Sequence, residues 1–266
     1  MTALSDKLVL KEISKSFGGM TVLDRVSLTV RSGEFVSIIG PSGSGKSTLL
    51  DIIAGLTGPD HGQVWIDGKE TTSRRGHAAY MPQKDVLLPW RTIVDNVAIP
   101  LELNGMSKKE ARQEAERWLP QFGLGGFAKH YPHQLSGGMR QRAAFLRTCL
   151  CKKELMLLDE PFGSLDALTR LDMQRWLMEV WQAFHTSVLL ITHDIEEAIF
   201  LSDRIYVFSP RPGKVAGEVS VELERPRRVE MTASEVFVRT KAKLMHILQT
   251  SYPMVSTHAQ KQEWRG

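Results

Sequence analysis

The chain has 266 residues, of which 42% are hydrophobic, so it can bury a sizeable core in one large or two small domains. Its net charge of +4 indicates no particular class of partner. With two cysteines and no apolar run near the ~18 residues of a membrane span, the composition excludes a disulfide-stapled secreted domain and a membrane-spanning protein. The first residues do not resemble a signal peptide, so we expect a cytoplasmic protein that reaches any membrane through a partner.

The N-terminal part of the chain predicts strands. Residues 8–30 alternate apolar and polar side chains on both sides of Gly18-Gly19, the pattern of two strands joined by a turn. Phe17 lies just before this turn. On residue type alone we favour core packing for Phe17 over a platform for a nucleotide base. The apolar run at residues 35–39 predicts a third, buried strand.

A glycine-rich segment follows that strand and precedes a helical run at residues 49–54. Strand, turn and helix are the context that the phosphate-binding pattern G-x-x-x-x-G-K-[ST] requires. Backbone N–H groups freed by the glycines and by the helix start can point at phosphate oxygens, which disfavours an ordinary turn. Lys46 can reach the β- and γ-phosphates, and the Ser47 hydroxyl can ligate Mg²⁺. The phosphate-binding residues predicted here are Gly40, Pro41, Ser42, Gly43, Ser44, Gly45, Lys46, Ser47 and Thr48.

The middle of the chain changes from strands to helices. After short strands at residues 63–68 and 78–82, residues 92–103 predict a helix broken near Pro100. Ser107 and Glu110 form a capping box that opens a further helix. Residues 86–151 therefore predict a mostly helical insert. A metal site at its end, on Cys149 and Cys151, is disfavoured because the two side chains diverge on a helix.

The rest of the chain alternates strands and helices, which argues for a largely parallel sheet. Strands are predicted at residues 155–158, 187–192 and 205–208, with an edge hairpin at residues 213–223. Asp166 can cap a helix at residues 167–184, and another helix covers residues 194–201. The long helix should bury one apolar face, formed by Leu168, Leu171, Leu177, Val180, Trp181 and Phe184. A last amphipathic helix covers residues 234–248, and a polar tail follows it.

Titratable residues follow two of the predicted buried strands. Asp159 and Glu160 end one strand, and His193 follows the next. Ligand sites of open α/β sheets lie at the carboxyl ends of strands, so we expect these residues near the glycine-rich segment. There, Asp159 can hold Mg²⁺ and Glu160 can deprotonate a water, whereas the alternative is an acidic pair that caps a turn. His193 is a candidate γ-phosphate sensor, although an isolated histidine is usually structural.

A second anion-binding device lies at residues 135–139. Ser136 is a good N-cap, and Gly137 and Gly138 expose backbone N–H groups at the start of a helix. A simple capped helix is the alternative. Two phosphate-binding helix ends far apart in sequence suggest that two subunits grip one nucleotide between them.

Together these motifs resemble an ATP-binding cassette (ABC) ATPase over about residues 8–250. The Walker A motif (40–48), Q-loop (Gln83), signature (135–139), Walker B motif (155–160), D-loop (164–166) and switch histidine (His193) occur in the family's order and spacing. The resemblance places Phe17 where an aromatic ring stacks on adenine, which reverses the preference stated above. It also adds Asp166 to the nucleotide site and Gln83 to the metal ligands Ser47 and Asp159. Met139 replaces the more common Gln of the signature, and we expect catalysis to survive this change.

The fold class that the resemblance implies is α/β. It comprises a P-loop NTPase core with a mainly parallel sheet, an antiparallel β subdomain and an inserted α-helical subdomain. We expect the nucleotide-binding core and the antiparallel subdomain at residues 1–85 and 152–230. The helical signature subdomain should cover residues 86–151, and a C-terminal helix and tail residues 231–266.

A narrower resemblance points to the ATPases of nitrate, sulfonate and taurine importers, a group that includes importers of thiamine pyrimidine precursors. The segments that carry it are residues 87–97, 161–170 and 209–213. It implies an ATP- and Mg²⁺-dependent homodimer, peripheral on the cytoplasmic face of the inner or plasma membrane. The dimer would power transmembrane permease subunits and, through them, use a periplasmic or lipoprotein solute-binding protein. Lys46, Gln83, Glu160 and His193 would carry the catalysis.

Several questions stay open at the sequence level. Leu87, Leu88 and Trp90 form an apolar cluster beside Gln83, which either receives a permease helix or packs internally. A mechanical ATPase acting on nucleic acid is the alternative function, but no long coiled-coil insert or basic patch with interleaved aromatics supports it. A GTP-dependent switch would leave the signature without a role. Contacts with the transported solute would belong to the permease and the solute-binding protein rather than to this chain.

Overall fold

The computed structural model describes residues 5–163, 165–184 and 186–251, and it contains two β-sheets. The first is antiparallel, with the order β2-β1-β4-β5. β1 (Asp6–Phe17) and β2 (Met20–Arg31) are the long pair predicted around the Gly18-Gly19 turn, and β4 (His61–Ile66) and β5 (Lys69–Glu70) extend the sheet. Alternate residues of β1 and β2 are buried, as expected for a sheet with one covered face.

The second sheet has six strands in the order β10-β9-β3-β8-β7-β6. All neighbours pair in parallel except β10 and β9. Every residue of β3, β7, β8 and β9 is buried, because helices or the first sheet cover both faces. This confirms the predicted, mainly parallel sheet. The strands are β3 (Phe35–Ile39), β6 (Ala79–Met81), β7 (Leu155–Asp159), β8 (Ser187–Ile191), β9 (Arg204–Phe208) and β10 (Val215–Ser220).

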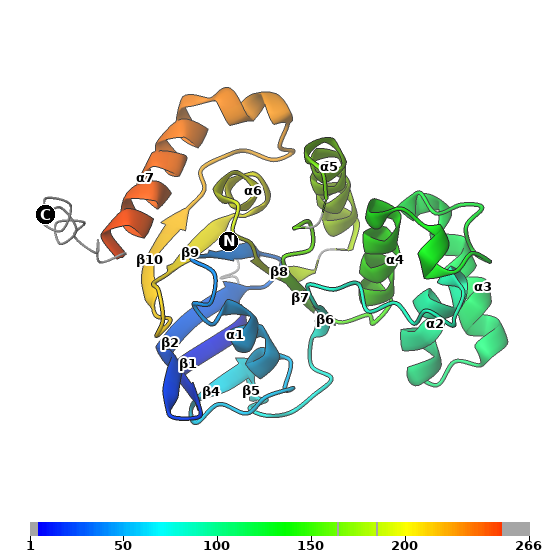
Figure 1. Ribbon diagram of the computed structural model, residues 1–266, viewed down its shortest axis with the longest axis horizontal. Coiled ribbons are helices and arrows are strands. Elements are labelled where there is room, and N and C mark those ends of the chain that lie inside the picture. The colour runs from blue at the N-terminus through cyan, green and yellow to red at the C-terminus, as the bar shows by residue number, and fades with distance from the viewer. Residues whose placement is uncertain (1–4, 164, 185, 252–266) are drawn as a thin grey trace, which may run out of the picture.

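Helices lie in two regions (Figure 1). Around the sheets are α1 (Lys46–Ile53), α5 (Ala167–Phe184), α6 (Ile195–Leu201) and α7 (Glu235–Ser251), with the 3₁₀ turn η3 (Val229–Ala233). At the other end of the molecule are α2 (Ile93–Leu103), α3 (Lys108–Trp118) and α4 (Gly137–Cys149), with η1 (Pro120–Phe122) and η2 (Pro132–Gln134). In the part of the chain that the structure describes, we find no helix with the length and apolar character of a membrane span.

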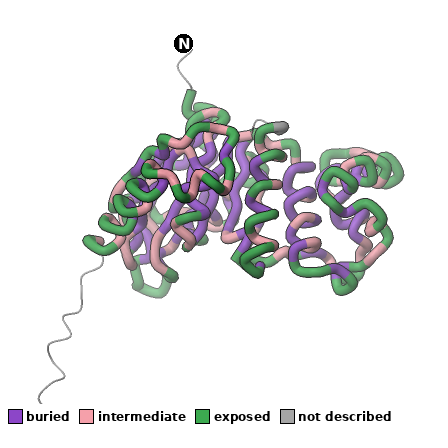
Figure 2. The backbone as a smooth tube through the Cα atoms, turned by 90° about the horizontal axis from the view of Figure 1, so that it is seen from above, coloured by how far each residue is buried: buried purple, intermediate pink, exposed green. Residues whose placement is uncertain are grey.

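Two apolar clusters hold these layers together, and buried residues follow the central strands in Figure 2. One cluster lies between the two sheets and includes Leu10, Val26 and Leu50. The other runs from the opposite face of the six-stranded sheet into the helices α2, α3 and α4, and includes Val97 and Phe145. The helical region is therefore packed continuously onto the core.

Three local predictions were wrong. α2 is not broken at Pro100; the proline lies inside the helix, where its buried ring packs. Residues 213–223 contribute a single strand, β10, which pairs with β9 instead of forming its own hairpin. On α5, Leu168 is 77% exposed and Leu171 is also exposed, so the predicted apolar face is buried only farther along the helix. The side chain of Phe184 and the polar tail after residue 251 lie outside the described residues.

Arg204 on β9 ties the two sheets together. It is 6% exposed, and its guanidinium donates to both carboxylate oxygens of Glu34 at 2.9 Å. It also donates to the backbone oxygen of Thr29 on β2 at 2.8 Å. The guanidinium of Arg204 is thus paired with a carboxylate and its N–H groups are hydrogen-bonded, so the buried positive charge is neutralised.

Replacing Arg204 with Met should lower the free energy of unfolding by about 3–5 kcal/mol, because it leaves the largely buried Glu34 carboxylate without its cationic partner. Urea denaturation of the nucleotide-free protein measures this loss. Arg239→Met is the matched control, since Arg239 is exposed and lies 3.8 Å from an exposed Glu222. Equal stability of the two variants would contradict the bridging role of Arg204.

Candidate functional site

The predicted phosphate-binding loop connects β3 to α1. α1 begins at Lys46, and the preceding Gly45 has a left-handed backbone with φ of 94°. A Cβ on Gly45 would lie 2.8 Å from Cδ2 of Leu23 and 2.9 Å from Cγ1 of Val22. Both the backbone conformation and the packing against β2 therefore require glycine at this position. The first turn of α1 leaves its N–H groups facing the loop, where an anion can accept them.

Lys46 is buried within this loop. Its ammonium group donates to the backbone oxygens of Gly40 at 2.9 Å and Pro41 at 2.8 Å. Burial lowers the pKa of Lys46, whereas the charges of Glu160 and Asp159 act in the opposite direction. A cation thus lies inside the loop, beside two acidic residues from β7 and the turn after it, and it can turn toward a bound phosphate.

Asp159, the last residue of β7, lies beside Ser47 of α1. The Ser47 hydroxyl donates to Oδ1 of Asp159 at 3.2 Å, and Asp159 is 3% exposed. Burial raises the pKa of Asp159, and the charges of Glu160 and Asp51 raise it further. Clustered carboxylate and hydroxyl oxygens with excess negative charge match the ligand preferences of Mg²⁺, so these residues fit that ion.

Glu160 is the meeting point of three separate segments. Nε2 of Gln83 donates to Oε2 of Glu160 at 3.0 Å, and Nδ1 of His193 lies 3.4 Å from the same oxygen. The backbone N–H of Glu160 donates to the oxygen of Ile191 at the end of β8. The φ of Glu160 is 44°, a left-handed conformation that costs about 1–3 kcal/mol for a residue with a side chain. The fold holds this carboxylate in place despite that cost.

Phe17 does not pack in the core. Its side chain is half exposed, and the ammonium group of Lys15 lies 5.2 Å from the ring centroid. It ends β1, directly before the turn into β2. The core-packing alternative for Phe17 is therefore wrong, and its ring is available for stacking.

The signature segment does not join this group of residues. α4 begins at Gly137 with Ser136 as its N-cap, whose hydroxyl accepts from the N–H of Met139 at 3.3 Å. A Cβ on Gly138 would lie 2.9 Å from Cγ2 of Thr169 on α5. A Cβ on Gly137 would lie 3.9 Å from Cδ2 of Leu165, so the contacts described for Gly137 and Gly138 are with the start of α5 and the turn before it, and not with residues 40–48 or 159–160. Ser136 and Gly137 are exposed to solvent.

The D-loop is described in part. Oδ1 of Asp166 accepts from the backbone N–H of Thr169 at 3.1 Å, which confirms its predicted role as the cap of α5. Hydrogen bonds from Thr169 lower the pKa of Asp166. The neighbouring Ser164, also part of the predicted D-loop, lies outside the described residues.

The geometry agrees with comparisons to known proteins. The family model of ABC transporters matches residues 23–163. The chain is 45% identical over 230 residues to the formylaminopyrimidine import ATP-binding protein ThiZ of Halalkalibacterium halodurans, covering 86% of this chain and 90% of that protein. This chain belongs to the ABC transporter ATPases.

Other relatives support this assignment. The ATPase is 42% identical to the taurine import ATP-binding protein TauB of Escherichia coli O157:H7, over 82% of this chain and 86% of that one. Proteins named for import of nitrate and of aliphatic sulfonates also match, which confirms the narrower resemblance predicted from sequence. A dimeric structure of the ATP-binding cassette MJ0796 bound to ADP and Pi aligns with a TM-score of 0.72, at 34% identity. That alignment covers 82% of this chain and 100% of that one.

Two residues that lie behind the site were not predicted from the sequence. Asp51 on α1 has a pKa raised by burial, and it contributes to the raised pKa of Asp159. Tyr80 on β6 hydrogen-bonds to Asp51. The spacing of Ser47 and Asp51, four residues apart on one helix face, was a signal for the first of these. No pattern in the sequence predicts the hydrogen bond between Tyr80 and Asp51.

Replacing Asp159 with Asn should raise the melting temperature of the nucleotide-free ATPase at pH 7. Because burial raises the native pKa of Asp159, the native state binds this proton more tightly than the unfolded chain. The stabilisation that this tighter proton binding gives is present at low pH and is lost as the pH rises through the native pKa. Asn stays neutral throughout and avoids that loss. The gain should vanish below the ordinary Asp pKa of about 3.9.

Thermal unfolding between pH 3 and 8 measures this difference. Asp166→Asn is the control, because the pKa of Asp166 is lowered and its removal should produce no gain at pH 7. A lower melting temperature for Asp159→Asn than for the parent at pH 7 would contradict this prediction, because the ionised carboxylate would then stabilise the native state.

Proposed function

We propose that this ATPase powers the uptake of a small solute through a partner permease. The observation that carries the proposal is the convergence of Gln83 and His193 on the Glu160 carboxylate, beside Lys46 and Asp159. The relatives named for import of formylaminopyrimidine and taurine support a small polar or anionic solute. They also favour the importer over a mechanical ATPase acting on nucleic acid.

In this proposal the nucleotide spans both sheets. The half-exposed ring of Phe17 stacks on adenine, with the base over the end of β1. The triphosphate lies along residues 40–48, where the N–H groups of the loop and of α1 donate to its oxygens. Lys46 leaves its backbone acceptors and pairs with the β- and γ-phosphates.

Ser47, Gln83 and Asp159 would hold Mg²⁺ at the phosphates. The bound ion neutralises charge on the phosphate oxygens. Burial, together with the charges of Glu160 and Asp51, raises the pKa of Asp159, and a bound cation would favour its ionised form, which supports this assignment. Removing divalent cations should therefore weaken nucleotide binding as well as turnover.

Hydrolysis needs a base next to the terminal phosphate, and Glu160 has that place in the proposal. Its carboxylate accepts a proton from water while the water oxygen attacks the γ-phosphorus, and ADP departs with the bonding electron pair. Gln83 and His193 orient the carboxylate, and His193 also holds the γ-phosphate. The left-handed backbone of Glu160 supports a functional role, since strain of this kind persists at sites that require it.

The signature would act in trans, in a homodimer. Ser136, Gly137 and Gly138 are intact, and the first two are exposed on the helical region rather than at residues 40–48. A second copy, facing the first head to tail, would present this helix start to the γ-phosphate, with Asp166 of the D-loop nearby. The dimeric structure of the related cassette MJ0796 supports this arrangement.

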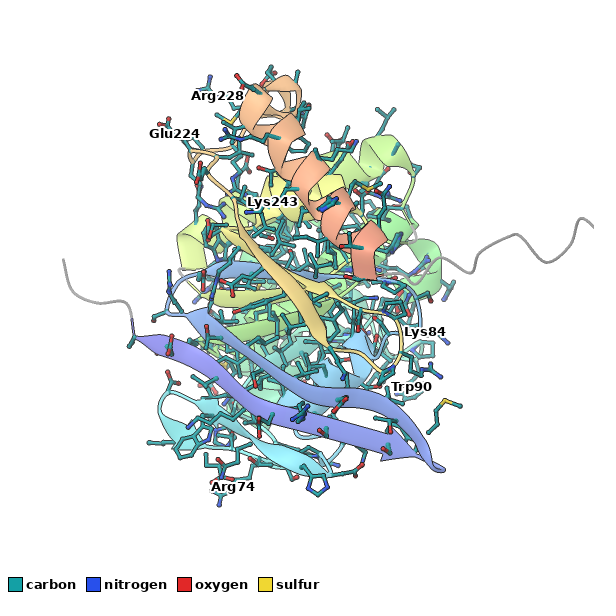
Figure 3. All side chains as sticks on the ribbon, turned by 90° about the vertical axis from the view of Figure 1, so that its left-hand side faces the viewer. Arg74, Lys84, Trp90, Glu224, Arg228 and Lys243 are labelled. Atoms are coloured by element: carbon teal, nitrogen blue, oxygen red, sulfur yellow. The ribbon has the colours of Figure 1, made fainter. Side chains whose placement is uncertain are left out.

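Coupling to the permease would use the helical subdomain, residues 86–151, at the membrane side. Trp90 is 72% exposed, and in Figure 3 it lies near Lys84 at the edge of the molecule. In the same predicted cluster Leu87 is buried and Leu88 is partly buried, so the three side chains differ in exposure. The buried Asn96 anchors the loop between them: its amide accepts from Leu88 N and donates to the oxygen of Arg91. An exposed indole on a rigid loop suits docking of a permease helix at the cytoplasmic face of the membrane.

Glu160→Gln should lower kcat about 10²–10⁴-fold, the usual contribution of a positioned general base, while the affinity for ATP changes little. Steady-state ATP hydrolysis and equilibrium binding of a fluorescent ATP analogue measure the two effects. Glu179→Gln, an exposed position on α5, is the control and should retain full turnover. Near-normal turnover of pure Glu160→Gln protein would remove Glu160 from this role.

Trp90→Ala should leave ATP hydrolysis by the isolated ATPase unchanged and weaken its stimulation by the reconstituted permease at least tenfold. Val238→Ala, a change at another exposed apolar side chain on α7, should alter neither rate. Full permease-stimulated hydrolysis by Trp90→Ala would exclude Trp90 from the docking surface.

A further inference from the structure

The connection between β9 and β10 lies against the nucleotide site. The N–H of Gly213 donates to the backbone oxygen of Val22 at 2.8 Å, and its own oxygen accepts from Asp24 at 3.1 Å. A Cβ on Gly213 would lie 2.1 Å from the backbone oxygen of Ser44. Residues 209–213, one of the segments that carry the narrower resemblance, therefore lie between β2 and the phosphate-binding loop.

This connection is internally braced. The Ser209 hydroxyl donates toward the backbone oxygens of Pro210 and Pro212 and accepts from the N–H of Lys214 at 3.1 Å. The ammonium group of Lys214 lies 2.6 Å from a carboxylate oxygen of Asp24. Because both ends of the segment are fixed, the side chain between them projects from a rigid base.

That side chain is Arg211, and it contacts both halves of the nucleotide site. Its Nε donates to the backbone oxygen of Gly43 in the phosphate-binding loop at 3.0 Å. Its Nη1 donates to Sδ of Met20 at 2.9 Å. Met20 is the residue that pairs with Phe17 across the β1–β2 turn. One planar guanidinium therefore connects the turn that carries Phe17 to the loop that would hold the phosphates.

We propose that Arg211 is a positioning residue that sets the separation between the base platform and the phosphate cradle, and thereby the affinity for a nucleoside triphosphate. The inference rests on the proposed roles of Phe17 and residues 40–48. A nucleotide gains from both subsites at once only when they are held at the right spacing in advance. A planar guanidinium holds two neighbours in a fixed geometry, whereas the donors of a lysine ammonium rotate at the end of a flexible stem.

Two ligands distinguish a positioning role of Arg211 from direct contact between Arg211 and phosphate. ATP uses the base platform and the cradle, whereas inorganic tripolyphosphate uses the cradle alone. If Arg211 sets the spacing, its loss weakens ATP and leaves tripolyphosphate nearly unchanged. If Arg211 binds a phosphate, its loss weakens both ligands equally.

The test measures dissociation constants of the full chain for ATP and for tripolyphosphate, each with Mg²⁺, by calorimetry. Arg211→Met should weaken ATP binding about tenfold and tripolyphosphate binding less than twofold. Arg211→Lys should also weaken ATP, although it keeps the charge. The KM for ATP should rise while kcat stays within about twofold, since Arg211 touches no reacting atom. Arg25→Met, at an exposed arginine on β2, is the control and should change neither constant.

Phe17→Ala makes the outcome decisive, because it removes the platform itself. In that background Arg211→Met should have almost no further effect on ATP binding. Equal weakening of ATP and tripolyphosphate by Arg211→Met, or no weakening of either, overturns the inference. If Phe17→Ala weakens ATP and Arg211→Met does not, the inference fails while the proposed function stands. If Phe17→Ala has no effect, the base platform and the inference fail together.

Discussion

The nucleotide site depends on the register of three parallel strands, β3, β8 and β7, which places their carboxyl ends side by side. In the parallel pairing, Ile38 of β3 and Asp159 of β7 both pair with Ile191 of β8. The residues that follow these strands therefore emerge side by side: the phosphate-binding loop, Glu160, and the turn with His193. A slip of one residue in either pairing would move Asp159 or Glu160 to the other face of the sheet. Complete burial of the three strands fixes the register and, with it, the geometry of the site.

Three features of the nucleotide site carry an electrostatic or conformational cost. Lys46 is buried against backbone oxygens, Asp159 ionises against neighbouring negative charge, and Glu160 holds a left-handed backbone. In the proposed function, phosphate would pair with Lys46 and Mg²⁺ with Asp159, so binding would offset part of this cost. The native protein is therefore less stable than it could be, because its site is already arranged for binding, as is common in active sites.

Much of this site could be predicted because its parts are local. The glycine-rich loop, the Asp166 cap and the acidic pair after a buried strand each follow from short segments of sequence. What sequence missed depends on tertiary contacts. Leu168 looks buried by periodicity, but the packing of α5 begins farther along the helix. Pro100 stays within α2 because its ring is buried there. The place of Arg211 beside Gly43 follows from a loop distant by 168 residues, which no local pattern encodes.

The Arg204 bridge has a mechanical consequence. Arg204 anchors the antiparallel sheet to the parallel one through Thr29 and Glu34. These residues lie at the end of β2 opposite the turn that follows Phe17. The β1–β2 pair is therefore held at two places, by Arg204 at Thr29 and by Arg211 at Met20, the residue opposite Phe17. A tilt of one sheet against the other would have to stretch one of these two contacts, so we expect the two sheets to move as one unit.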